Sequence, residues 1–261
     1  MKHLARCLRL PAAPLAVLIV TTSLTGLGVA TPIPTLAQNP SQDASQGTSQ
    51  GTSRNTSQST SRNTTDDTDA SDLPAPFTDT SLEAWKERKF AGSTRYRLVE
   101  KDGIRALEAT SDGSASILYR KEKIDLAVTP TLRWWWRVDT LFDGIDQQRK
   151  DGDDFPARLY VVARLGPLPW NTLALNYVWT TSIPAGTVWH NPFTEKAAMI
   201  AVRSGPADLG HWVVQERNLV EDFQSAFGRA IDEIAGYAVM TDGDNSGQRA
   251  TSWFGEMRFL P

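Results

Sequence analysis

The sequence predicts an all-β fold: an antiparallel β-sandwich of the jelly-roll or galactose-binding-like type, with one short helix. Three observations predict it. Short segments alternate apolar and polar residues with a period of two, as strands do when they bury one face. Glycine, proline and aspartate separate these segments at turn spacing. All nine tryptophans lie at or beyond Trp85, so the bulk for a large core is concentrated in the C-terminal part of the chain.

Residues 1–37 have the order of residues found in a secretory signal peptide. Lys2, Arg6 and Arg9 precede an apolar stretch that runs towards Ala30, and small residues offer cleavage after Ala30 or after Ala37. The alternative is an uncleaved membrane anchor, since the apolar stretch approaches the length that spans a bilayer. We expect export to the periplasm or the extracellular space, with membrane contact only through this segment.

Residues 38–72 are predicted to be a disordered linker rich in Ser, Thr, Gln and Asn. They repeat a four-residue unit from Thr48 onward and contain no aromatic side chain. Such a segment cannot bury enough apolar surface to offset its ordering entropy, so it should act as a solvated tether. The alternative is a glycosylated stalk, because Asn55 and Asn63 fit the acceptor pattern. Residues 73–261 then form a single β-sandwich domain.

The clearest strands of this domain are residues 132–139 and 158–165. In the first, Trp134 and Trp136 fall on one face and Trp135 on the other. Because successive side chains point to opposite faces, both segments are predicted to be half-buried strands. Weaker candidates with similar length and flanking turns are residues 94–99, 104–110, 114–120, 172–179, 198–204, 211–218, 234–241 and 251–260.

One helix is predicted at residues 219–227. Asn218 can cap its first turn, Glu221 stands three residues later as in a capping box, and Gly228 can end it. Its apolar stripe predicts that it covers an open end or edge of the sandwich.

Composition excludes several function classes. The formal net charge is −3 and the sequence pI is about 5.7, which argues against a nucleic-acid partner. Cys7 is the only cysteine, so the processed protein would have no disulfide, thiol nucleophile or thiolate-held metal. With His190 and His211 as its only histidines and no Gly-x-Ser-x-Gly motif, it lacks the material for a three-histidine metal site or a nucleophile elbow.

Two acidic segments are candidate calcium sites. Clustered carboxylates on loops supply the oxygen ligands that calcium needs, and the weak nominees are Asp151, Asp153, Asp242 and Asp244. Neither segment has the spacing of an EF-hand loop. Turns and local ion pairs explain both segments equally well, since glycine and asparagine in residues 242–247 suit a tight hairpin. No cofactor is required by this sequence, and calcium is the one ion it suggests.

A face of aromatic and polar side chains is the candidate ligand-binding surface. Aromatic planes stack on sugar rings, polar groups hold hydroxyls, and arginine pairs with carboxylates. The residues assigned to this face are Trp135, Arg137, Arg158, Tyr160 and Asn176. The alternative is that the arginines pair with nearby acids to close the ends of the sandwich.

Paired carboxylates flanking a cleft could instead hydrolyse glycosides. The weak catalytic nominees are Glu216, Asp153, Asp154 and Asp222.

Several segments together resemble a bacterial family of exported domains of unknown function. They span most of residues 77–261 and are 132–138, 152–161, 176–179, 216–218, 222–228 and 242–247. The resemblance implies one β-rich domain and export, and it brings no activity.

The leading functional hypothesis is therefore an exported, non-catalytic β-sandwich module that binds a carbohydrate or a cell-envelope polymer, with calcium assistance as an option. The alternatives are a glycan-active hydrolase or lyase that uses paired carboxylates, and a periplasmic scaffold or assembly domain.

Overall fold

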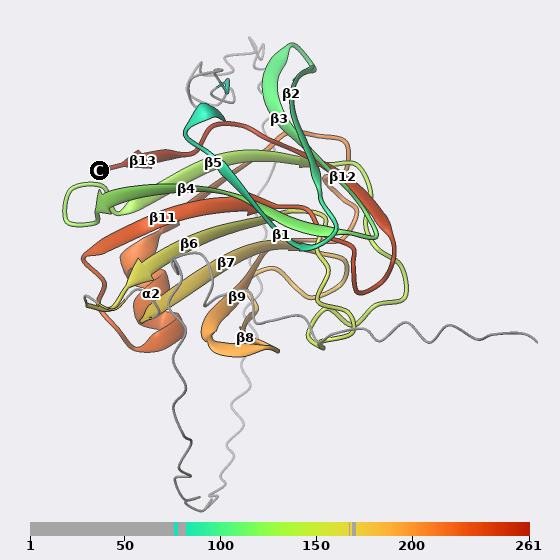
Figure 1. Ribbon diagram of the computed structural model, residues 1–261. Helices are drawn as coiled ribbons and strands as arrows, with labels where there is room; N and C mark the ends of the chain where they lie inside the picture. Colours follow the sequence, from blue (N-terminus) through green and yellow to red (C-terminus); the bar gives the residue numbers. More distant parts are fainter. Residues whose placement is uncertain (1–75, 78–81, 167, 169–170) are drawn as a thin grey trace, which may run out of the picture. The chain divides into compact units, whose positions relative to one another are not determined.

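The fold is a β-sandwich of two sheets with one short helix, as the sequence predicts (Figure 1). The structure is a computed structural model that describes residues 76–77, 82–166, 168 and 171–261. The predicted signal peptide and linker lie outside these residues. Within the described residues, no helix is long and apolar enough to cross a membrane.

The first sheet has seven strands. In spatial order they are β1 (Lys86–Ala91), β4 (Ala115–Asp125), β11 (Glu233–Met240), β6 (Arg158–Arg164), β7 (Thr172–Thr180), β9 (Thr194–Ser204) and β8 (Val188–Asn191). All neighbours are antiparallel except β7 and β9, which run parallel. The predicted antiparallel β-sandwich is confirmed, and the β7–β9 pair is its one parallel pair among the described strands.

The second sheet has six strands. They are β10 (Val213–Asn218), β5 (Thr131–Val138), β12 (Arg249–Phe254), β3 (Ile104–Asp112) and β2 (Arg95–Lys101), with β13 (Arg258–Leu260) paired to the first half of β5. The predicted strand 251–260 is therefore two strands, because residues 255–257 leave the ladder between β12 and β13.

Two edge strands were not predicted. The sequence of β1 is mostly charged, and β8 has four residues, so neither shows clear alternation. Charged side chains and short length are both features by which edge strands of natural sheets avoid pairing with other chains.

The core lies between the sheets and is rich in tryptophan. Trp134 and Trp136 of β5 point inward and are fully buried, with their ring centroids 5.5 Å apart in an edge-to-face arrangement. Across the sandwich, Tyr177 lies 5.1 Å from Trp134, and Trp179 lies 6.0 Å from Trp136. The period-two pattern thus places these tryptophans inside and Trp135 on the opposite face of β5.

The helix α2 (Leu219–Phe227) begins and ends where the sequence predicts. The Asn218 side chain accepts hydrogen bonds from the backbone N–H groups of Val220 and Glu221 at 3.0 and 3.2 Å. Gly228 has φ 63°, the left-handed conformation that glycine adopts without strain. Leu219 is buried against the core, and α2 packs on β7 and β10.

The strand β6 is buried on both faces, so the prediction that it is half-buried is wrong. Its outward-facing Tyr160 and Val162 belong to a second apolar cluster on the outer face of the seven-stranded sheet, with Ala174 and Ala238 of neighbouring strands. The outer faces of the two sheets therefore have different environments.

Candidate functional site

The five predicted ligand-binding residues are divided between the two outer faces of the sandwich. Trp135 and Arg137 lie on the outer face of the six-stranded sheet, whereas Arg158, Tyr160 and Asn176 lie on the outer face of the seven-stranded sheet. The five residues therefore form two separate groups, one of three residues on the seven-stranded sheet and one of two residues on the six-stranded sheet. Alternation in sequence identifies the two faces of a strand but not the sheet to which the strand belongs.

On the seven-stranded sheet, Arg158 is the centre of a buried ionic cluster. Its guanidinium is fully buried; Nε donates to Oδ1 of Asp242 at 2.8 Å and Nη1 to Oδ1 of Asp153 at 3.5 Å. Nη2 also contacts Asp242 and the backbone carbonyl of Asp153. We call Arg158, Asp153, Asp154, Asp242 and Asp244 the Arg158 cluster. Such buried pairs are expensive to break because each partner would be left as an isolated charge.

Asp154 fixes the neighbouring turn of residues 242–247. Its Oδ1 accepts from the backbone N–H and the side-chain amide of Asn245 at 3.2 and 3.1 Å, and its Oδ2 accepts from the backbone N–H of Ser246 at 2.6 Å. A Cβ on Gly243 would stand 2.3 Å from the carbonyl oxygen of Gln248, so only glycine fits there. The geometry is that of a tight, hydrogen-bonded turn.

Burial and neighbouring charges shift the pKa values of the Arg158 cluster. Burial is the main cause that raises the pKa of the Asp153 carboxyl to about 6, against the opposing effect of Arg158. Burial also raises the pKa values of Asp242 and Asp244, with the neighbouring Asp154 charge adding to the effect. Burial acts to lower the pKa of Arg158, but Asp153 and Asp242 outweigh it and raise that pKa. The Arg158 cluster thus holds four carboxyl groups and one guanidinium, which pairs with two of them, Asp153 and Asp242.

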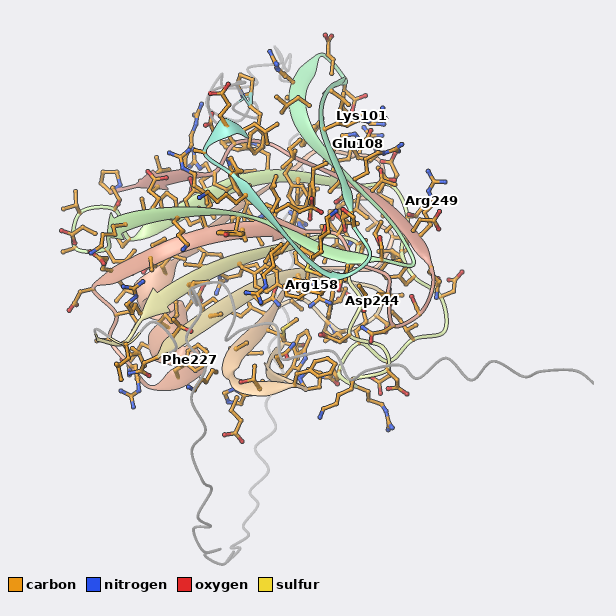
Figure 2. All side chains as sticks on the ribbon, in the orientation of Figure 1. Lys101, Glu108, Arg158, Phe227, Asp244 and Arg249 are labelled. Atoms are coloured by element: carbon orange, nitrogen blue, oxygen red, sulfur yellow. The ribbon has the colours of Figure 1, made fainter. Side chains whose placement is uncertain are left out.

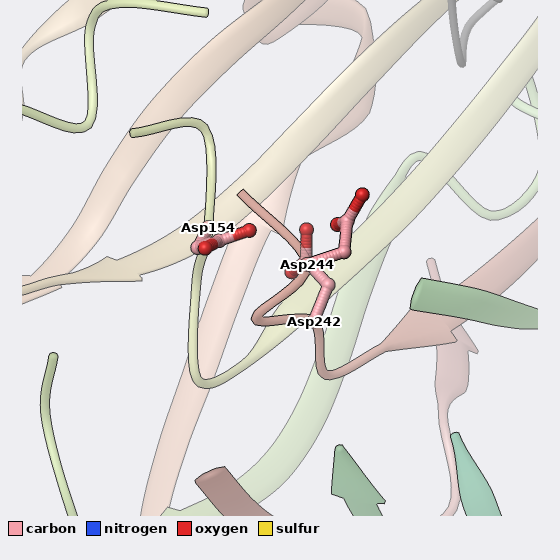
Figure 3. Close-up of side chains that lie close together, drawn as sticks. All are labelled: Asp154, Asp242 and Asp244. Carbon is pink, nitrogen blue, oxygen red and sulfur yellow. The ribbon is translucent and has the colours of Figure 1, made fainter. Parts of the chain in front are cut away.

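Three of the carboxylates converge. Oxygens of Asp154, Asp242 and Asp244 all lie within 4.8 Å of one another, with Asp154 on one loop and the other two on the adjacent turn (Figure 3). Of the remaining two calcium nominees, Asp153 is bound to Arg158, and Asp151 is exposed beside Arg149.

Tyr160 and Asn176 are also buried beside Arg158. The Tyr160 hydroxyl lies 3.4 Å from Nη1 of Arg158, and the side-chain amide of Asn176 donates to Met199 Sδ at 3.1 Å. Among the described residues, Oδ1 of Asn176 has no hydrogen-bond partner. This group of predicted ligand residues is enclosed rather than open to a polymer.

The four catalytic nominees do not form one site. Asp153 and Asp154 belong to the Arg158 cluster on the outer face of the seven-stranded sheet. Asp222 instead accepts a hydrogen bond, 2.6 Å long, from the hydroxyl of Tyr177, which lies on the inner face of the same sheet. Asp222 also accepts from Nε of Arg217 at 2.9 Å. Glu216 accepts from Nε of Arg133 at 2.7 Å.

Glu216 and Asp222 do share one cavity. It has a volume of about 330 Å³ and lies beneath α2, between β9 and β10. Both carboxylates are nevertheless engaged by arginines, so neither is poised as a free acid or base.

A groove that the sequence did not indicate lies on the outer face of the six-stranded sheet. Two hollows of about 420 and 520 Å³ adjoin there and share Arg95, Thr110 and Arg249. We call these adjoining hollows the sheet groove. Its lining comes from β2, β3, β12, the turns before β2 and after β3, and the segment that follows β5: Ser93, Arg95, Arg97, Glu108, Thr110, Asp112, Ser114, Asp139, Thr140, Arg249, Ala250, Thr251 and Trp253. In Figure 2 the labels of Glu108 and Arg249 mark this region.

Three of the six charged residues that line the sheet groove, Arg97, Glu108 and Asp139, are neutralised in place. Arg97 Nε donates to Glu108 Oε1 at 2.7 Å, and Arg137 Nε donates to Asp139 Oδ1 at 2.8 Å. Trp253 forms part of the floor and is 7% exposed. It is covered by Lys101, whose Nζ lies 4.2 Å from the ring centroid. Within the described residues, the indole N–H of Trp253 has no hydrogen-bond partner.

Two arginines of the sheet groove differ from the others. Arg95 and Arg249 line both hollows, and neither side chain forms a hydrogen bond or an ion pair with any described residue. The carboxylate of Asp112, directly across the ladder from Arg249, is likewise unpaired among these residues. The alternation of cationic and apolar residues in β2 was the signal in the sequence that could have indicated this face.

The molecule is thus a two-sheet β-sandwich with an open polar groove on one sheet. Residues 83–258 match the family model described as "Protein of unknown function (DUF3047)", and the chain belongs to that family. A comparison with curated protein sequences found no match.

Solved structures similar to this chain include carbohydrate-binding modules and a glycosidase domain. One is a carbohydrate-binding module from the β-sandwich superfamily, with TM-score 0.38 and 14% identity over 72% of this chain and 61% of that one. The chain therefore spans less than two thirds of that structure.

Another is the family 11 carbohydrate-binding module of a cellulosomal cellulase of Clostridium thermocellum, with TM-score 0.35 and 8% identity over 68% of this chain and 87% of that one. A third is the xyloglucanase domain of the type three effector NopAA of Sinorhizobium fredii, with TM-score 0.38 and 10% identity over 71% and 96%. At such identities and TM-scores these likenesses assign no ligand or activity to this chain.

Proposed function

We propose that this protein is an exported, non-catalytic module that binds a carbohydrate or cell-envelope polymer in the sheet groove. The observation that carries the proposal is the continuity of the two hollows, which meet at Arg95, Thr110 and Arg249 on one sheet face. An elongated, open surface suits a polymer chain better than a small molecule, which is usually enclosed.

The chemistry of the lining supports a polyhydroxylated ligand. Threonine hydroxyls donate and accept hydrogen bonds, a carboxylate accepts them from hydroxyls, and guanidinium groups donate them. The hydroxyl oxygens of Thr110 and Thr251 lie 3.2 Å apart in the sheet groove, and Asp112 lies two residues from Thr110 on the same face of β3.

To test the proposal, we would express the given sequence and measure its binding to a panel of neutral and acidic envelope polysaccharides. Affinity electrophoresis and calorimetry would give the affinities. A Thr251→Val variant keeps the size of the side chain and removes a hydroxyl that lines the sheet groove. We expect it to weaken binding by about three- to tenfold, the effect of one hydrogen bond.

Thr194→Val is the matched control. Thr194 is partly buried like Thr251, but it lies in β9, outside the sheet groove. Equal losses in both variants, or no binding to any polysaccharide, would contradict the proposal and leave the scaffold hypothesis.

Export rests on the predicted signal peptide of residues 1–37. We expect the mature protein outside the cytoplasm with an N-terminus at residue 31 or 38, following cleavage after Ala30 or Ala37. N-terminal sequencing of the exported protein tests both cleavage sites, and an intact N-terminus on membrane-bound protein would favour the anchor.

We propose calcium assistance at one place, the three converging carboxylates of Asp154, Asp242 and Asp244. The support is the excess of negative charge around Arg158, which a divalent cation would reduce. The N–H groups that already occupy Asp154 limit its capacity as a ligand. Calcium should raise the melting temperature relative to EDTA, and Asp244→Asn should abolish that rise. No rise in the wild type would remove calcium from the proposal.

A further inference from the structure

We propose that the sheet groove selects an acidic polysaccharide, one whose sugar units carry carboxylates, and that Arg95 and Arg249 are the residues that select it. This rests on the proposed function, because it names the class of polymer that the sheet groove binds.

The first argument is that these two guanidinium groups are unused. The other arginines on this sheet face whose contacts are described have partners: Arg97 pairs with Glu108, and Arg137 pairs with Asp139. Arg95 and Arg249 have none among the described residues, although both are exposed and both line both hollows. Arginine binds a carboxylate through two parallel N–H groups, so an unpaired pair of them in a groove favours ligands with carboxylates.

The second argument is the spacing of the two arginines. Arg95 stands opposite Thr110, and Arg249 stands opposite Asp112, so they are two strands and two residues apart across β3. With strands about 4.8 Å apart and a rise of about 3.4 Å per residue, their Cα atoms are separated by roughly 12 Å. The two guanidinium groups can therefore address separate acidic groups along a polymer.

The third argument concerns the groups beside the arginines. Once the ion pairs are formed, the sheet groove presents two free guanidinium groups and the one free carboxylate of Asp112. That balance favours an anionic ligand, but Asp112 would repel a simple polyanion. A uronic-acid unit satisfies both requirements, because its carboxylate can pair with arginine while its ring hydroxyls donate to Asp112 and the threonines.

The experiment compares three probes by calorimetry at low and moderate salt: polygalacturonate, its carboxyl-reduced neutral form, and polyacrylate, a polyanion without hydroxyl groups. We expect the wild-type protein to bind polygalacturonate at least tenfold more tightly than either of the others. Exposed charges are screened by salt, so this preference over the neutral form should decrease as ionic strength rises.

The variants are Arg95→Gln, Arg249→Gln and both together, with Arg229→Gln as the control for loss of one unpaired positive charge outside the sheet groove. Each single variant should weaken polygalacturonate binding about tenfold, and the double variant more, while the control stays within twofold. An unchanged melting temperature shows that the fold is intact.

The outcomes separate the two proposals. Equal binding of the neutral and acidic polymers would overturn the selection by Arg95 and Arg249 and leave the proposed function standing. Equal binding of polyacrylate and polygalacturonate would also overturn it, since the sheet groove would then be a site for any polyanion. Binding of no saccharide at all would overturn the proposed function and this inference together.

Discussion

The two outer faces of the sandwich use the same residue types for opposite purposes. In the Arg158 cluster, arginine and aspartates are buried and bound to one another, and the second apolar cluster adjoins them. In the sheet groove, Arg95, Arg249 and Asp112 are exposed and unpaired among the described residues. Paired, buried charges hold loops in place, whereas unpaired, exposed charges are available to a ligand. Burial and pairing, rather than residue type, distinguish structure from site.

The largest expected effect that sharpens this comparison comes from Arg158→Ala. It would leave Asp153 and Asp242 buried without their cation, so we expect the free energy of unfolding to fall by about 3 to 5 kcal/mol. Urea denaturation measures this loss, with Arg249→Ala expected to change stability by no more than about 0.5 kcal/mol. Similar losses in the two variants would break the distinction.

The next effect concerns Asp154→Ala. It removes the acceptor of the backbone N–H groups of Asn245 and Ser246, so we expect a loss of about 2 kcal/mol, within the range for unsatisfied buried donors. Asp112→Ala is the matched change in the sheet groove, and its stability should remain close to that of the wild type. Denaturation curves of the two variants at one pH make the comparison, and a stable Asp154→Ala protein would contradict it.

A smaller effect is expected from pH. Because the pKa of Asp153 is raised to about 6, the folded state keeps a proton that the unfolded chain has lost between about pH 4 and pH 6. Stability therefore decreases as the pH rises through this window, by about 1 to 2 kcal/mol between pH 5 and pH 7. The raised pKa values of Asp242 and Asp244 act in the same direction.

Denaturation at pH 5, 6 and 7 in EDTA measures this dependence. Asp153→Asn should reduce the pH dependence, leaving the part due to Asp242 and Asp244, and Asp112→Asn should leave it as in the wild type. A wild-type protein that gained stability from pH 5 to pH 7 would show that Asp153 is ionised without penalty.

The smallest effect on stability is expected in the sheet groove itself. Arg95→Gln and Arg249→Gln remove no side-chain hydrogen bond or ion pair with a described residue, so each should alter the free energy of unfolding by less than about 0.5 kcal/mol. Denaturation of the same proteins used for binding checks this. A larger loss would indicate a structural role for these arginines.

The sequence predicted the elements better than their arrangement. Asn218 and Gly228 define the helix locally, and alternation correctly separates Trp134 from Trp135. Strands at the sheet edges were missed because charged or very short segments carry no periodic signal.

The site was less accessible to prediction, because it depends on pairing between distant segments. The hydrogen-bonded Thr110 and Thr251 in the sheet groove are 141 residues apart in sequence. Alternation likewise could not show that Arg137 and Arg158 belong to different sheets. Both facts are fixed by topology, which residue patterns do not specify.

The position of β11 and β12 has a consequence for folding. Each lies in the interior of its sheet, β11 between β4 and β6 and β12 between β3 and β5, although both come from the last part of the chain. Neither sheet can therefore be completed until residues 233–254 are available. We expect no stable folded fragment that ends before β11, and a nascent chain that stays unfolded until residues 233–254 have been synthesised.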